Sequence, residues 1–384
     1  MAIYDFDELD KKYNRFDSPI AVVKINNKEL PSSKKSYGVT DYDIELTCGF
    51  EASIASFSIV GAYDNTKSEY DMDGLKDYIM LGSKVEIYLG YENQAKHVFT
   101  GLIAKVNYQF EPGDMGVVRI TAMDAKCVMM AGVYSRQLKA TGFVDAVKEI
   151  FEKSNYQQLK SNGIIDDSKI GSVSLGSIST PGLASESKDV TIEMVAESDY
   201  EFIVKMAKRN NYEFYIDCGT VIFRKAKGDK SVIMKLVPRM GIQSFDIEYD
   251  ITAIAETVFA RATNANKGEV MEAKGKFSNK ISIGNKAKNM IKGSQKIYID
   301  PTITTKDEAQ DRVDSLMEEM SYRYGTLYMD IVGLPELKPG YYLDLQSLGT
   351  GPSNIFYIVN VQHILRGDGK FFTRVTARTN AILG

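Results

Sequence analysis

Histidine and cysteine are the side chains that most often bind metals or act as nucleophiles, and this chain holds few of them. His97 and His363 lie far apart, and neither belongs to an HExxH pattern. Cys48, Cys127 and Cys218 form no CxxC pair, which favours buried free thiols over a metal site or a disulfide. His363 alternates with apolar residues along a predicted strand, so a packed or interface histidine is favoured over a metal ligand.

Paired carboxylates are the second group of side chains that could do chemistry. Asp166-Asp167 falls in a predicted loop, and Glu318-Glu319 falls on a predicted helix. Two carboxylates flanking a glycosidic bond can hydrolyse it, and they need only be close in space. A hydrolase with scattered carboxylates is therefore one of the alternatives that the sequence leaves open.

Glycine-rich signatures of nucleotide and phosphate binding are missing. The chain has no GxSxG motif, no P-loop and no dinucleotide-binding glycine pattern. GDMG at 113–116 and GDGK at 367–370 both join predicted strands, where turn glycines account for them. The pair Lys34-Lys35 is interpreted as a solvated turn rather than a nucleic-acid patch. We therefore predict that the protein is no enzyme, with no catalytic, cofactor-binding or metal-binding residues and no cofactor.

Composition places the chain among ordinary globular proteins. It has 384 residues, 44% of them hydrophobic and 26% charged, which is enough for two or three domains with sizeable cores. The net charge of −4 gives no argument for nucleic acid. No apolar run is long enough to span a bilayer, and the polar, acidic N-terminus has no signal-peptide core. We expect the protein to fold in the cytoplasm.

Leu327 to Asn380 carries the clearest structural pattern, a period of two that predicts extended strands. Ile355, Tyr357, Val359 and Val361 fall on one predicted strand face. Turn residues at 338–340, 349–352 and 367–369 separate the strands. The segment is therefore expected to form an antiparallel meander with apolar residues on both faces, as in a small barrel.

The same pattern occurs earlier in the chain. LGSKVEIYLGY at 81–91 matches KPGYYLDLQSL at 338–348, so Gly82 corresponds to Gly340 and Val85 to Leu343. The third strand contains Arg-Ile-Thr-Ala at 119–122 in one copy and Arg-Val-Thr-Ala at 374–377 in the other. The similar order and spacing predict a duplicated barrel, although any two meanders share some of these features.

The predicted fold is mainly β, with two tube-protein-like antiparallel barrels flanking a small α/β domain. Residues 1–18 are expected to form an arm that packs on a neighbouring subunit. Residues 19–130 form the first barrel, in whose middle strand Leu102, Ala104, Val106, Tyr108 and Phe110 share a face, with a loop from Tyr108 to Gly116.

Residues 131–240 are predicted to form the α/β domain. A helix is expected around Phe143–Phe151, and the polar stretch Asn155–Lys188 is interpreted as a loop. Ser198 and Glu201 have the spacing of a capping box, and Asn210-Asn211 can end that helix in a left-handed conformation. A hairpin turning at Cys218-Gly219 follows.

Residues 241–384 form the predicted second barrel, with a helix near 305–322. Thr305 and Glu308 have capping-box spacing, and Gly325 stands where this helix is expected to end. The apolar stripe of the helix is predicted to consist of Ala309, Val313, Leu316 and Met320. Gly268–Asp300 is rich in Lys, Gly and Asn and is interpreted as an excursion or mobile loop.

Three stretches, in order, resemble the family of phage late control protein D and VgrG-type baseplate hubs. The first barrel carries LGSKVEIYLGY and VFTGLIAKVNY, and the middle domain carries AESDYEFIVKMAKRNNYEFYIDCGTVIF. The closing barrel carries GLPELKPGYYLDLQ and YIVNVQHILRGDGKFFTRVTA. The resemblance covers most of residues 19–380. It differs from the fused VgrG form, because no oligonucleotide-binding-type barrel or β-helical spike follows in this sequence.

The resemblance implies a structural hub of a contractile tail or injection-system baseplate that adapts a sixfold tube to a threefold spike. It implies a homotrimer whose partners are the tail-tube protein, a separately encoded spike protein and other baseplate components. Such a hub assembles in the cytoplasm and then becomes part of a virion-like particle. The alternative is a cell-wall or glycan-binding module of a tail. The sequence does not distinguish a phage from a bacteriocin or an injection system.

Overall fold

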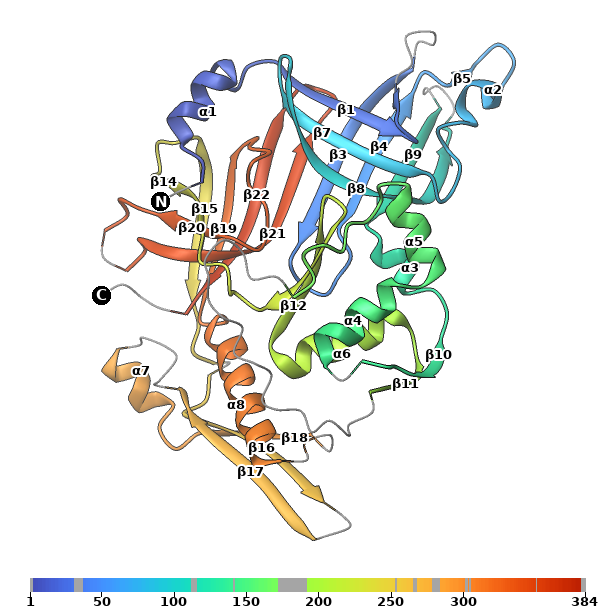
Figure 1. The fold of residues 1–384 in the computed structure, drawn as a ribbon. Coiled ribbons are helices and arrows are strands. Elements are labelled where there is room, and N and C mark those ends of the chain that lie inside the picture. The colour runs from blue at the N-terminus through green and yellow to red at the C-terminus, as the bar shows by residue number, and fades with distance from the viewer. Residues whose placement is uncertain are drawn as a thin grey trace.

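A computed structural model describes residues 3–30, 37–111, 116–140, 142–171, 192–252, 254–264, 268–277, 284–300, 303, 305–349 and 351–380. Across these residues the chain is mainly β, with antiparallel strands and a smaller helical part, which confirms the predicted fold class (Figure 1). Four hydrophobic clusters organise it, one in the main sheet, one in the middle α/β unit, one around a long C-terminal helix, and a smaller one that includes Tyr215, Tyr322 and Tyr357.

Thirteen strands of the described residues form one sheet, and the two predicted barrels are its two halves. The strands of the first half are β1 (Pro19–Ile25), β2 (Lys28–Leu30), β3 (Gly38–Thr47), β4 (Ile54–Val60), β7 (Lys84–Tyr91), β8 (Gln94–Gln109) and β9 (Val117–Met123). Those of the second half are β14 (Val232–Leu236), β15 (Ile242–Tyr249), β19 (Gly325–Val332), β20 (Tyr342–Leu345), β21 (Asn354–Leu365) and β22 (Phe371–Thr379). The halves join where β21 pairs with β3, so they are continuous rather than separate.

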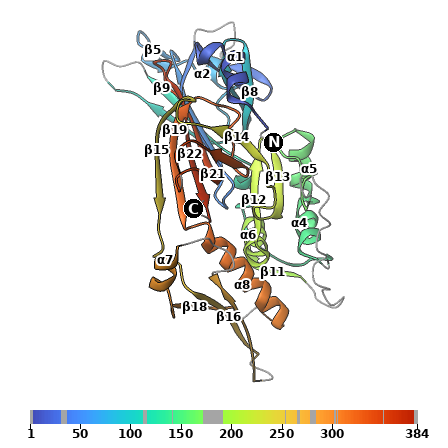
Figure 2. The same cartoon turned by 90° about the vertical axis from the view of Figure 1, so that its left-hand side faces the viewer.

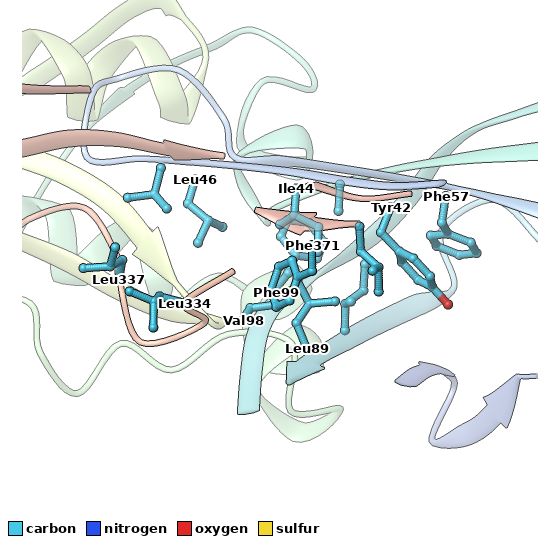
Figure 3. Close-up of a cluster of buried hydrophobic side chains, with 14 of the residues drawn as sticks. Tyr42, Ile44, Leu46, Phe57, Leu89, Val98, Phe99, Leu334, Leu337 and Phe371 are labelled. Carbon is cyan, nitrogen blue, oxygen red and sulfur yellow. The ribbon is translucent and has the colours of Figure 1, made fainter. Parts of the chain in front are cut away.

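One hydrophobic core lies under both halves of the sheet. Figure 3 shows Leu89 and Phe99 of the first half beside Phe371 and Leu334 of the second. Tyr91 of β7 also stacks against Phe371, with ring centroids 5.5 Å apart. Because the halves bury each other's side chains, neither has a complete core of its own.

The two halves repeat the same strand order. In the first half β3, β4, β9, β8, β7 and β1 are successive neighbours, and in the second half β15, β19, β22, β21, β20 and β14 are. Val85 and Leu343, which the sequence places at matching positions, are both fully buried. The only difference in strand direction is at the last pair, since β1 runs antiparallel to β7 whereas β14 runs parallel to β20.

Hydrogen bonds and bulges confirm the correspondence at the level of single residues. Gly82 donates its backbone N–H to Ile103 at 2.9 Å, and Gly340 donates to Ile358 at 3.0 Å. Both glycines have a left-handed φ, +80° and +87°, which a residue with a side chain rarely adopts. The register then shifts by one residue after Ile103 in β8 and after Ile358 in β21. The repeat therefore includes a β-bulge at the same place in each half.

These bulges correct the predicted strand faces. Leu102 packs in the core of the middle unit, whereas Val106 packs against the core of the sheet. In β21, Ile358 and Val361 both face the sheet core, although strict alternation puts them on opposite faces. The extra residue of a bulge reverses the alternation beyond it, and nothing in the sequence marks its position. Strand β8 also extends to Gln109, into the predicted loop.

The described part of the N-terminal arm packs on its own chain, and the expected contact with a neighbouring subunit stays a prediction. Helix α1 (Phe6–Lys12) is followed by a short 3-10 turn, η1 (Asn14–Phe16), and Phe6, Leu9 and Tyr13 are buried in the main core. Ile3 donates a backbone hydrogen bond to Val232 of β14 at 2.9 Å. Although most residues of the arm are polar, its helix has an apolar face, and this face packs against the core of the main sheet.

The middle α/β unit lies beside the first half of the sheet (Figure 1). Its elements are α3 (Lys126–Met129), β10 (Tyr134–Gln137), α4 (Phe143–Phe151), α5 (Ser154–Ser161), β11 (Glu193–Glu197), α6 (Asp199–Asn210), β12 (Tyr212–Asp217) and β13 (Thr220–Lys225). The capping box of Ser198 and Glu201 is confirmed, as is the left-handed Asn211 that ends α6. Helix α5 corrects the predicted loop at its start, and residues 172–191 of that loop lie outside the described residues.

A third unit occupies the segment expected to be an excursion. Strands β16 (Thr257–Asn264), β17 (Glu269–Lys276) and β18 (Gln295–Ile299) form a small sheet, with α7 (Asn285–Met290) between β17 and β18. Helix α8 (Lys306–Ser321) packs its predicted apolar stripe on this sheet and is capped by Thr305. The helix ends before Gly325, which instead begins β19, where a side chain would meet Tyr249 and Thr379.

Two short strands and a helical turn complete the first half. They are β5 (Tyr63–Asp64), β6 (Glu69–Tyr70) and α2 (Met72–Leu75), which lie in the connection between β4 and β7. Tyr63 and Tyr70 stack on Phe110 and Tyr108 at the end of β8, with centroids 4.8 and 5.1 Å apart. This connection therefore covers part of one face of the distal half of β8.

Candidate functional site: buried polar groups and the outer edges of the sheet

Both histidines are packed side chains. His363 is fully buried between Val361 and Leu365, and its Nδ1 lies 3.0 Å from Thr373 Oγ1. Burial lowers the pKa of His363 to about 4, so the ring is neutral at physiological pH. His97 stacks on Tyr88 and lies 2.8 Å from Thr100 Oγ1, and burial lowers its pKa as well. The structure places the two histidines on different strands with these separate partners.

The three thiols are free, as the sequence predicts. Burial raises the pKa of Cys48 to about 12 and that of Cys127 to about 11. Burial also raises the pKa of Cys218, and Asp217 adds to the effect. A thiol with a raised pKa stays protonated at neutral pH, so these cysteines are poor nucleophiles.

The acidic pairs are engaged in local contacts. Asp166 accepts a hydrogen bond from Ser168 at 2.9 Å, and Asp167 forms an ion pair with Lys160. On α8, Glu318 accepts from Asn211 Nδ2 at 2.8 Å, and Glu319 pairs with Arg323 at 2.5 Å. In the part of the chain that the structure describes, no group of three His, Cys, Asp or Glu side chains could hold a metal ion.

The glycine segments are turns where they are described. In the 367–370 segment Gly369 donates to the carbonyl of Arg366 at 2.9 Å, which closes the turn between β21 and β22. Most of the 113–116 segment, and the pair Lys34-Lys35, lie outside the described residues. In the same turn Gly367 donates its backbone N–H to Asp41 Oδ1 at 3.1 Å.

A buried polar cluster, which sequence reasoning missed, joins the middle unit to the second half of the sheet. Arg224 of β13 donates to Glu213 at 2.6 Å and pairs with Asp229, and the phenol of Tyr357 of β21 donates to Glu213. Arg224 also donates to the carbonyl of Gly340 at 3.0 Å. The members come from three separate stretches, so no local spacing could have revealed them.

Charge pairing dominates this cluster. Burial opposes the charge on Arg224, but Tyr215 and Glu213 beside it raise its pKa overall. Burial raises the pKa of Tyr357, with Cys48 and Glu213 adding to the effect. The guanidinium is thus fully charged and bound to carboxylate, phenol and backbone oxygens, which makes the cluster a fixed joint rather than a proton-transfer site.

A cleft of about 830 Å³ opens next to this joint, between β3, α6 and β21. Its lining includes acidic residues such as Glu45 and Glu51 and basic residues such as Lys208 and Arg374. The mixed charge favours neither an anionic nor a cationic ligand.

The outer edges of the main sheet are the second candidate functional feature. Strand β15 is the last strand at one end of the described sheet, and it runs along its outer side (Figure 2). The distal half of β8, residues 105–109, pairs with β9 on one side only. Phe245 on β15 and Tyr108 on β8 expose much of their rings. A strand edge with unpaired backbone groups and exposed apolar side chains can accept a further strand.

Comparison with solved structures gives the fold a context. The tail protein from Neisseria meningitidis MC58 is 13% identical, with a TM-score of 0.64, covering 95% of this chain and 98% of that chain. The 43 kDa tail protein of prophage MuSo2 from Shewanella oneidensis is 12% identical, with a TM-score of 0.65, covering 94% and 98%. An E. coli component of the type VI secretion system is 10% identical, with a TM-score of 0.54, covering 92% and 76%. The fold is therefore similar to that of these tail and secretion proteins.

Two further findings concern the chain as a whole. No curated protein matches its sequence. Among the described residues, no helix has both the length and the apolar character needed to cross a membrane.

A family model matches nearly the whole repeat. It spans residues 22–367, from within β1 to the turn between β21 and β22, and so includes both halves of the sheet, the middle unit and the third unit. Because this match covers far more than half of its sequence, the chain belongs to the family described as the Alg8 N-terminal domain.

Proposed function

We propose that this chain is a structural hub of a contractile tail or injection-system baseplate, which adapts a sixfold tube to a threefold spike. The observation that carries the proposal is the duplicated sheet, in which two halves of the same strand order follow each other in one chain. Three copies of such a chain supply six similar halves, which a sixfold tube could meet. The fold that the chain shares with phage tail proteins supports this reading.

The proposal includes a division of labour between parts of the chain. The half at 19–130 and the second half, which includes β14 at 232–236, face the tube, and the α/β unit between them keeps threefold symmetry toward a separately encoded spike. The arm at 1–18 fixes the second half through its contact with β14. The homotrimer assembles in the cytoplasm and then joins other baseplate components in a virion-like particle. No catalytic step belongs to this role, so we propose that the protein is not an enzyme.

Co-expression with the tube and spike candidates encoded beside this chain tests the proposal. The expected result is a stable complex in which native mass spectrometry finds three copies of this chain with one spike. A monomer that binds neither partner but co-sediments with cell walls would favour the glycan-binding alternative. A complex containing six copies in a ring would contradict the threefold hub.

A further inference from the structure

The junction between the two halves defines a strand pairing with a fixed register. Residues 360–365 of β21 pair antiparallel with residues 42–47 of β3, so that His363 lies opposite Ile44 and Gln362 opposite Glu45. On the outer face, Asn360 donates to Glu45 at 2.9 Å and Gln362 donates to Asp43 at 2.7 Å. The inner face of the same junction is buried in the shared core.

Strand β15 is the repeat counterpart of β3 in this junction. Tyr42-Asp43-Ile44-Glu45 in β3 corresponds to Phe245-Asp246-Ile247-Glu248 in β15, with three of four residues identical. Ile44 lies opposite Ala55 of β4, and Ile247 lies opposite Leu327 of β19, at the matching place. The acidic residues that accept the junction's hydrogen bonds are therefore present again on β15.

The distal half of β8 is the repeat counterpart of the other side of the junction. Counting from the shared bulge, residues 105–110 correspond to residues 360–365 of β21. Asn107 then stands for Gln362, Lys105 for Asn360 and Tyr108 for His363. The amide donor Gln362 thus has another amide donor, Asn107, as its counterpart, and the amide donor Asn360 has the cation Lys105.

At the internal junction β3 and β21 cover each other's edges, whereas β15 and the distal half of β8 have no such neighbouring strand among the described residues. Among the described residues, β15 pairs only with β19, and residues 105–109 pair only with β9. Tyr42 is 5% exposed whereas Phe245 is 40% exposed, and His363 is fully buried whereas Tyr108 is 42% exposed. Leu365 is 7% exposed and its counterpart Phe110 is 50% exposed. Side chains that the internal junction buries are therefore partly open at both free edges, although Tyr108 and Phe110 also contact Tyr70 and Tyr63.

We propose that the free edges bind each other between copies, with β15 of one chain pairing antiparallel with residues 105–110 of β8 in the next. The register is that of the internal junction, which puts Tyr108 opposite Ile247 and Asn107 opposite Glu248. On the outer face, Lys105 forms an ion pair with Glu248, and Asn107 donates to Asp246. The outward-pointing backbone N–H and C=O groups of both edges gain partners, as in other cases of strand addition, apart from the carbonyl of Gln109, which already accepts from the Tyr70 hydroxyl at 2.8 Å.

The geometry of the contact determines the kind of assembly. The two edges belong to different halves of the sheet, since β15 begins the strand order in the second half and β8 lies in the first half, so the contact is heterologous and each chain both gives and receives a strand. Heterologous contacts close into a ring when the rotation between copies allows it. The number of copies in that ring, three, rests on the proposed hub function, whereas the register rests on the repeat alone.

Engineered disulfides test the register directly. Asn107→Cys with Glu248→Cys places one thiol on each edge, at directly opposed positions whose spacing a disulfide can bridge. Gln362→Cys with Glu45→Cys is the matched control, because it is the same pair of positions at the internal junction. Asn107→Cys with Ile247→Cys puts the second thiol on the opposite strand face, and the parent chain measures the background from its native thiols.

Oxidation should link the control pair within single chains and link Asn107→Cys/Glu248→Cys between chains, giving covalent trimers on a non-reducing gel. If Asn107→Cys/Glu248→Cys gives only monomers while the control pair is oxidised, the proposed interface is overturned. Equal crosslinking by Asn107→Cys/Ile247→Cys would overturn the register. Closed rings of another number would leave the interface standing but overturn the threefold hub.

Charge reversal gives an independent test without new thiols. Lys105→Glu and Glu248→Lys should each weaken self-association by at least tenfold in sedimentation, because each places like charges across the edge. The double variant Lys105→Glu/Glu248→Lys restores opposite charges and should recover most of the loss. Both side chains are exposed in the single chain, so folding is not expected to change. Failure of the double variant to recover would contradict this ion pair.

Discussion

At the residue scale, burial decides what the chemically capable side chains can do. The thiols stay protonated because burial raises their pKa values, and His363 stays neutral because burial lowers its pKa to about 4. The charged cluster around Arg224 is bound on every side by carboxylate, phenol and backbone oxygens. These groups therefore fix the relative position of the units and do not form a reactive site.

His363 makes stability sensitive to acid, and the sign follows from its pKa. The ring takes up a proton near pH 6.5 in the unfolded chain but only near pH 4 in the folded protein, so the unfolded state binds more protons between these values. Stability should fall as the pH falls from about 6.5 toward 4, by up to about 3 kcal/mol from this residue.

Replacing this side chain with His363→Gln should flatten that part of the pH dependence, although lost packing lowers stability at pH 7.5. Urea unfolding at pH 7.5, 6, 5 and 4 measures the effect, with His97→Gln as the control at a less buried site. An unchanged slope between pH 6.5 and 4 in His363→Gln would show that other groups cause the acid sensitivity.

At the element scale, periodic patterns predicted the strands and most helices, but not the details that depend on tertiary contacts. The meander, the capping box at Ser198 and the stripe on α8 were local patterns and are confirmed. The predicted side-chain faces of β8 beyond Ile103 and of β21 beyond Ile358 were wrong, because one extra residue in a bulge reverses the alternation. The polar segments around α5 and β17 fold because neighbouring elements cover their few apolar residues.

The candidate site was less predictable than the fold. Glu213 and Arg224 face each other in the β12–β13 hairpin, and the cluster with Tyr357 is complete only when this hairpin meets β21, which no local spacing indicates. The strand edges could have been inferred in part, since the Asp-Ile-Glu triplet occurs both at 43–45 and at 246–248. Recognising the first as paired and the second as open still required the strand order.

The shared core predicts that damage to either half unfolds both. Val85→Asp or Leu343→Asp puts an unpaired charge at a fully buried position, at a cost of about 3–5 kcal/mol. Because residues of both halves fill one hydrophobic cluster, each variant should unfold the sheet in a single transition at lower denaturant concentration.

Urea titration followed by far-UV circular dichroism and by a probe in the opposite half checks this expectation. The control is Asp344→Asn, which lies on the opposite face of β20 from Leu343 and should change stability by well under 1 kcal/mol. Two separate transitions in Val85→Asp, with the second half still folded, would show that the halves are independent domains.

At the scale of the whole molecule, the described features favour assembly over chemistry. The repeat gives each chain two similar halves, one junction inside and one open strand edge in each half. The middle unit is held to the sheet by the Arg224 cluster, and the arm is held by β14, so these parts are tied to the body that carries the two matching edges. Heterologous pairing of those edges is the assembly that such a body permits without exposing new apolar surface.

The same features predict that the purified protein has no hydrolytic activity on cell walls. Its thiols are protonated, and the acidic pairs at 166–167 and 318–319 are bound to nearby amides, hydroxyls and cations. Turbidity of a peptidoglycan suspension should therefore stay constant over hours at pH 5, 6 and 7.5, while a known hydrolase run in parallel clears it. The complex with its spike should behave in the same way. Sustained clearing that a single substitution such as Glu318→Gln or Asp167→Asn abolishes would contradict a purely structural role, because a contaminating hydrolase would be insensitive to that change.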